Sequence, residues 1–195
     1  KPEITAPGGS IYSVNGVVPG GQAYETMSGT SMASPQVAGM AALIAQYIQE
    51  NHLDEKTGLS PRQLGQSLLM STAVPVMEDF GDGNGYYPVL RQGAGLANPA
   101  AAMASQAYIQ VEGTNKSKFE LGDDPERTGV YTMDFEVVNF SDGEKTYTLD
   151  TAVLGQKAEG GQIRGGKVTY LVYDYARKLS AAVTSSAADG RITVP

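Results

Sequence analysis

A serine at the predicted start of a helix is the feature of this sequence best suited to chemistry. Residues 27–35 read MSGTSMASP, and the residues from Met32 to about Gln49 are predicted to be helical. The first N–H groups of a helix lack partners within it, and the helix dipole favours negative charge there. Ser31 could therefore be a nucleophile whose oxyanion meets free N–H donors, and Gly29 would let a substrate backbone come close.

Ser31 also has a purely structural interpretation, because serine is among the commonest helix N-caps. The segment is not the nucleophile elbow G-x-S-x-G of the α/β-hydrolases, since the second glycine would fall at Ala33. The spacing alone leaves the nucleophile and the cap as alternatives.

Ser31 must be positioned by the elements before and after it in the chain. Residues 3–5 and 11–14 are predicted to be short strands separated by a Pro-Gly-Gly turn. The helix after Ser31 carries apolar residues around nearly its whole circumference, which is typical of a helix buried on all sides. Pro35 fits its first turn, where a missing N–H costs nothing.

Two further helices are predicted from their caps. Ser60 precedes a proline and is followed three residues later by Gln63, a capping box for a helix that ends near Ala73. Asn98 and the proline after it predict the start of a short helix over residues 100–104.

Length and composition exclude several classes of function. The chain has 195 residues, no Cys, one His and a formal charge of −7. It can form neither disulfides nor thiolate metal sites. An acidic balance without a basic stretch argues against nucleic acid as a partner. No apolar run approaches the roughly 20 residues of a membrane-spanning helix, so no membrane insertion is expected.

The composition changes near Ser105. Residues 1–105 hold all but one of the seven Met and are predicted to be rich in helix. Residues 106–195 alternate Tyr, Val and Thr, with strands predicted at 108–111, 131–137, 146–149 and 168–173. Short strands separated by turn residues are typical of a β-sandwich.

The whole string around Ser31 resembles a known family. Residues 29–35 (GTSMASP), followed by Val-Ala-Gly at 37–39, resemble the serine signature of the subtilisin-like serine peptidases, the subtilases. Residues 1–8 (KPEITAPG) resemble the strand and turn that lead toward that serine. The resemblance implies that Ser31 is the nucleophile and contributes its N–H to the oxyanion hole, that the Thr30 hydroxyl supports the hole, and that Gly29 lines the cleft. The family often has Asn where this chain has Ser28.

A second stretch extends the resemblance. Residues 91–98 (RQGAGLAN) resemble the end of the catalytic domain in cell-envelope proteinases of the lactocepin type, where a fibronectin type III-like sandwich follows. The implied fold class is α/β over residues 1–105, the C-terminal part of a subtilisin-like parallel-sheet domain. An all-β, fibronectin type III-like sandwich, incomplete at its end, is implied for residues 106–195. The implied parent is exported, attached to the cell surface or cell wall, and acts on protein or peptide substrates.

A serine nucleophile needs a base, and this chain offers only His52. About 20 helical residues at roughly 1.5 Å each place His52 some 30 Å from Ser31, so we expect a solvated histidine at the far end of the helix. In subtilisins the triad order is Asp, His, Ser, so both partners are expected upstream of Lys1. The chain alone is therefore predicted to be inactive.

Two weaker signals concern ions and assembly. Asp79, Asp82 and Asn84 offer oxygens for calcium, but the spacing is not that of an EF-hand and a plain turn accounts for it, so no cofactor is predicted. Residues 191–195 resemble the start of a strand in a sandwich that is cut short, and the exposed edge could pair with another copy.

Two other functions stay open at this point. The chain could belong to a non-catalytic surface binding or adhesion module whose peptidase half is degenerate, with Tyr-rich strands carrying the interaction. It could also belong to an esterase that uses a similar serine. The upstream sequence would decide the first alternative, and peptide against ester turnover the second.

Overall fold

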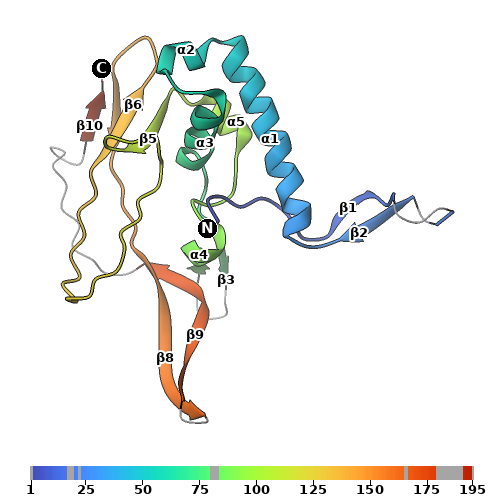
Figure 1. Ribbon diagram of the computed structural model, residues 1–195, viewed down its shortest axis with the longest axis vertical. Helices are drawn as coiled ribbons and strands as arrows, with labels where there is room; N and C mark the ends of the chain where they lie inside the picture. The colour runs from blue at the N-terminus through green and yellow to red at the C-terminus, as the bar shows by residue number, and fades with distance from the viewer. Residues whose placement is uncertain are drawn as a thin grey trace.

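A computed structural model describes residues 2–16, 20–21, 23–79, 84–164, 167–178 and 191–194. A group of helices lies at the centre, the hairpin of β1 and β2 projects from one side, and the long ribbon of β8 and β9 points away below (Figure 1). In chain order the elements are β1 (Ile11–Val14), β2 (Tyr24–Met27), α1 (Thr30–Glu50), α2 (Leu53–Thr57), α3 (Pro61–Ser71), β3 (Met77–Asp79), β4 (Asn84–Tyr86), α4 (Val89–Gln92), α5 (Pro99–Ala104), β5 (Ala107–Val111), β6 (Phe135–Asn139), β7 (Lys145–Thr148), β8 (Leu154–Arg164), β9 (Lys167–Lys178) and β10 (Arg191–Val194).

The predicted helix caps are confirmed. The Ser60 side chain accepts the Gln63 N–H at the start of α3, and the Gln63 side chain in turn accepts the Ser60 N–H. The side-chain oxygen of Asn98 (Oδ1) accepts the Ala101 N–H at 3.0 Å and caps α5. Because caps depend on residues three apart in the chain, they are correctly predicted from sequence.

Helix α1 is buried along one stripe, so the prediction of burial on all sides is wrong. Ile44 and Ile48 are fully buried, whereas Leu43 is 55% exposed. Helices α3 and α5 contact α1 from one side, and Met40 and Tyr47 pack against the same core. The apolar circumference shows how much of α1 could be buried, but burial also requires elements on every side of the helix.

The main core spans helices and strands. It joins α1, α3 and α5 to the first strands after Ser105, with buried members Ile44, Ile48, Leu53, Leu59, Leu64, Leu68, Leu69, Ala97, Ala102, Tyr108 and Phe140. The rings of Tyr108 and Phe140 lie 6.2 Å apart, and the Phe140 N–H donates to the Gln106 carbonyl. Burial and the carboxylate of Glu136 raise the pKa of Tyr108.

The strands of the second half pair in small antiparallel sheets. Strand β5 pairs with β6, β7 pairs with β10, and β8 and β9 continue the sheet of β3 and β4. The predicted strands at 108–111, 146–149 and 168–173 overlap β5, β7 and β9, whereas β6 begins only at Phe135. Among the described residues these sheets have two or four strands each, and the fibronectin type III-like sandwich is not confirmed.

Parallel pairing is confined, in the part of the chain described, to one bridge between Thr5 and Leu96. Residues 3–5 therefore lie extended beside residues 94–97 and form this bridge in place of the predicted strand. None of the described helices is both long and apolar enough to cross a lipid bilayer.

Candidate active site

Ser31 occupies the second position of α1. The helix begins at Thr30, and its N-cap is Gly29, which offers no side-chain cap. The interpretation of Ser31 as an N-cap is therefore wrong. Ser31 and Thr30 are both exposed to solvent at the end of the helix.

The first turn of α1 leaves N–H donors open. The N–H groups of Met32 and Ala33 both point to the Gly29 carbonyl, at 3.0 and 3.4 Å. Within the described residues, the N–H groups of Thr30 and Ser31 have no hydrogen-bond acceptor. A free N–H beside the hydroxyl of the same residue, at the positive end of a 21-residue helix, suits an anionic oxygen.

Three hydrogen bonds hold the N-terminal segment against the start of α1. The Gly29 N–H donates to the Gly8 carbonyl at 2.8 Å. The Gln36 side-chain amide donates to the Pro7 carbonyl, also at 2.8 Å. The Ser10 N–H donates to the Ser28 hydroxyl at the same distance. The Ser28 hydroxyl thus fastens the turn before β1.

The tightest backbone contact in this region is at Gly8. A Cβ on Gly8 would lie 2.6 Å from the Gly29 oxygen and 3.1 Å from the Ala33 Cβ. A Cβ on Gly29 would meet nothing nearer than 3.8 Å. The contact that requires a glycine therefore lies at Gly8, which the sequence did not single out.

Residues 93–97 brace the same segment from its other side. The Thr5 N–H donates to the Gly95 carbonyl, and the Ala97 N–H donates to the Thr5 carbonyl, both at 2.9 Å. A Cβ on Gly93 would collide with the Glu3 carbonyl, and Gly93 has a φ of +63°. Gly93 therefore permits close backbone contact with the segment that leads to Ser31, whereas Gly95 permits a close contact with Val74.

The hairpin of β1 and β2 lies outside the main core and leads directly into the start of α1. Its strands pair antiparallel from Ile11 opposite Met27 to Val14 opposite Tyr24. The rings of Tyr12 and Tyr24 stack with centroids 5.5 Å apart, and Tyr12 is 70% exposed. Strand β2 ends two residues before Gly29, so the hairpin is joined directly to the helix start.

His52 lies at the other end of α1, as expected. It follows the 21-residue helix, its side chain is 74% exposed, and its nearest ionic neighbour is Glu55, at 3.5 Å. At about 1.5 Å per residue, the helix separates His52 from Ser31 by roughly 30 Å. His52 and Ser31 are thus not brought together.

The proposed calcium ligands lie at the β3–β4 hairpin, where Asp79 is opposite Asn84. Residues 80–83, which include Asp82, lie outside the described residues. Among the described residues, no group of three or more His, Cys, Asp or Glu could hold a metal ion.

A serine hydroxyl on the first turn of a long helix, beside its own free N–H, is an arrangement that can serve acyl transfer, and it lies in a domain of mixed helices and strands. The profile of the subtilase family matches residues 1–118. The chain belongs to the subtilase family.

The chain is similar to proteinases and peptidases of far greater length. The chain is 30% identical over 193 residues to a PII-type proteinase of Lactococcus lactis subsp. cremoris, with 85% of this chain and 10% of that protein covered. It is 31% identical to a PII-type proteinase of Lacticaseibacillus paracasei, with the same coverage. It is 28% identical over 160 residues to a C5a peptidase of Streptococcus pyogenes, with 82% and 13% covered. The chain thus spans about a tenth of the length of these relatives.

Proposed function

We propose that this chain is the nucleophile-bearing part of a subtilisin-type serine endopeptidase. The position of Ser31 supports this proposal, since an exposed hydroxyl and an open N–H share one residue at the start of α1. Membership of the subtilase family also supports it.

The proposed reaction is peptide hydrolysis in two steps. The Ser31 Oγ attacks the scissile carbonyl carbon while its proton passes to a histidine outside this chain. The resulting oxyanion accepts the Ser31 N–H, with the Thr30 hydroxyl in support and Gly29 lining the cleft. The C–N bond breaks as the histidine returns the proton to the leaving amine. Water then hydrolyses the Ser31 ester and restores the hydroxyl.

The isolated chain is proposed to be inactive. Its single histidine is remote from Ser31, and a serine hydroxyl without a base is a weak nucleophile. The Asp and His of the triad are expected upstream. The parent is proposed to be exported and held at the cell surface, with residues 106–195 spacing the catalytic domain, and to cleave proteins or peptides.

A fluorophosphonate probe tests the nucleophile. The parent protein and the 195-residue chain are treated in parallel, and the label is located by mass spectrometry. We expect labelling of Ser31 in the parent alone, its loss in Ser31→Ala, and its retention in Ser34→Ala, three residues along the same helix. No label in a folded parent would favour the binding module, and label in the chain alone would show that no upstream base is needed.

Self-association is proposed through the edge of the β7–β10 pair. Strand β10 pairs with β7 from Arg191 opposite Thr148 to Val194 opposite Lys145. Unpaired N–H and C=O groups on a sheet edge favour pairing with a second chain. Light scattering at increasing concentration should show a growing mass, and a constant monomer mass would rule this out.

A further inference from the structure

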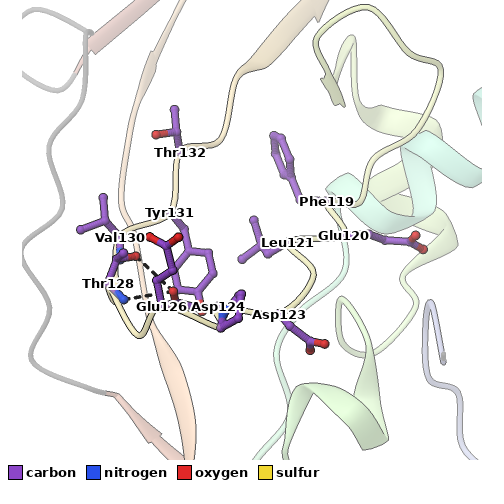
Figure 2. A pocket seen from close by; sticks show the side chains of 11 residues that line it. Phe119, Glu120, Leu121, Asp123, Asp124, Glu126, Thr128, Val130, Tyr131 and Thr132 are labelled. Carbon is purple, nitrogen blue, oxygen red and sulfur yellow. Dashed lines mark hydrogen bonds between the residues drawn. The ribbon is translucent and has the colours of Figure 1, made fainter.

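A cavity of about 450 Å³ lies in the long connection between β5 and β6. Figure 2 shows its side chains, which come from two stretches of the connection that face each other, residues 119–126 and 128–132. In Figure 1 this yellow connection and the hairpin of β1 and β2 lie on opposite sides of the central helices. The cavity is therefore separate from the Ser31 site.

The cavity offers apolar surface that the fold leaves exposed. Val130 is 75% exposed, Tyr131 47% and Leu121 46%, and Phe119 lies beside them. Four large apolar side chains around one hollow are more than the scattered single residues of an ordinary surface.

The charged side chains that line the cavity are all acidic. Glu120, Asp123, Asp124 and Glu126 line it, and no basic residue does. Glu120 has a cation nearby, since the Lys118 ammonium lies 3.4 Å from its carboxylate. Asp123 and Glu126 have no hydrogen bond or ion pair among the described residues, so their carboxylates remain available to a ligand.

Asp124 fixes the turn that carries these groups. Its carboxylate accepts the Gly129 N–H at 2.7 Å and the N–H and hydroxyl of Thr128 at 3.0 and 3.3 Å. Its carbonyl accepts the Arg127 N–H at 3.1 Å. The turn is therefore held by Asp124. In Figure 2 the Glu126 side chain lies beside Tyr131 and Val130, and Asp123 projects on the other side of Leu121.

We propose that this cavity binds a basic segment of a polypeptide, in which a Lys or Arg stands next to a large apolar residue. The cation would lie at Glu126, beside the ring of Tyr131, and Asp123 would add to the negative field of the cavity. The apolar neighbour would cover Leu121 and Val130, which removes their surface from water. An acidic segment would be repelled. The site acts through charge complementarity and apolar contact, so it is independent of the chemistry at Ser31.

Fluorescence anisotropy with a labelled decapeptide, Gly-Ser-Gly-Leu-Arg-Phe-Lys-Gly-Ser-Gly, tests the proposal on the 195-residue chain and on the parent. We expect a Kd on the order of 10–100 μM. The double variant Asp123→Asn/Glu126→Gln should weaken binding about tenfold or more. The matched control Glu112→Gln/Glu144→Gln removes the same charge from exposed sites outside the cavity and should leave the Kd unchanged.

Two further peptides separate the cavity from general attraction to an acidic protein. Replacing Leu and Phe of the peptide with Ser should weaken binding about tenfold, and replacing Arg and Lys with Glu should abolish it. The proposal is overturned if the cavity variant and the control variant weaken binding equally. It is also overturned if the serine peptide or spermidine alone binds as tightly, or if no peptide binds at 1 mM, a concentration roughly tenfold above the upper end of the expected Kd.

Discussion

Side-chain packing holds helix α1 at its C-terminal end, whereas main-chain contacts hold it at its N-terminal end. Ile44 and Ile48 are fully buried against α3, where a Cβ on Gly65 would already touch Ile44 at 3.4 Å. At the other end, the Gly29 N–H donates to the Gly8 carbonyl, the Gln36 side-chain amide donates to the Pro7 carbonyl, and Ser31 is exposed.

This difference separates stability from chemistry along one helix. The packed end contributes apolar burial, which makes up most of the stabilisation of a domain. The exposed end contributes little burial but fixes the backbone on which the proposed nucleophile lies. Substitutions at the two ends should therefore change different measured quantities.

The largest expected effect on stability is at the packed end. Ile44→Ala should lower the free energy of unfolding by about 2–5 kcal/mol, because it removes a fully buried side chain and leaves a cavity. Leu43→Ala, one residue earlier and 55% exposed, is the matched control and should change it by less than about 0.5 kcal/mol. Urea unfolding followed by circular dichroism measures both, and equal losses would contradict the packing described.

The next effect is on reactivity, at the N-terminal end. Gly8→Ala should slow fluorophosphonate labelling of Ser31 in the parent by about 10–100-fold, because the new Cβ pushes the Gly29 carbonyl and shifts the helix start. Gly9→Ala is the control, since a Cβ there meets nothing within 4 Å. Equal labelling rates in the two variants would show that Gly8 does not position Ser31.

Substitution of Gln36, at the N-terminal end of α1, should have a smaller effect on the labelling rate of Ser31. Gln36→Ala removes the amide that donates to the Pro7 carbonyl, and should cost about 0.5–1.5 kcal/mol and slow labelling a few-fold. Gln46→Ala removes a side-chain bond to Glu50 near the other end of α1 and should leave the labelling rate unchanged. A slower rate in Gln46→Ala would instead mean that the helix responds as one unit.

Local signals were predicted well from sequence, and long-range contacts were not. The caps at Ser60 and Asn98 need only a residue three positions away. The start of α1 was placed at Met32, two residues late, because Gly29 caps with its carbonyl and not with a side chain. The role of Ser31 as nucleophile stays a prediction that rests on the family resemblance of the serine signature, which helix capping alone does not supply.

The features that the sequence did not predict depend on partners far along the chain. Gly8 is needed because the Gly29 carbonyl packs against it. Gly93 is needed because the Glu3 carbonyl packs against it. The exposure of Leu43 depends on the elements around α1 and not on its own periodicity. Strand β6 begins at Phe135 and not at residue 131, because pairing with β5 defines it.

The smallest effect is expected in the turn of Asp124, which main-chain bonds hold as they hold the start of α1. The N–H groups of Gly129 and Thr128 hold the pKa of Asp124 below its ordinary value of 3.8. The folded form therefore favours the carboxylate, and its contribution to stability is complete above pH 3.8. That contribution is lost only as the pH falls through the lower folded pKa. The Gly129 amide resonance should accordingly titrate below pH 3.8 in NMR spectra and stay constant with pH in Asp124→Asn. A Gly129 titration above pH 3.8 would show that these N–H groups do not stabilise the carboxylate.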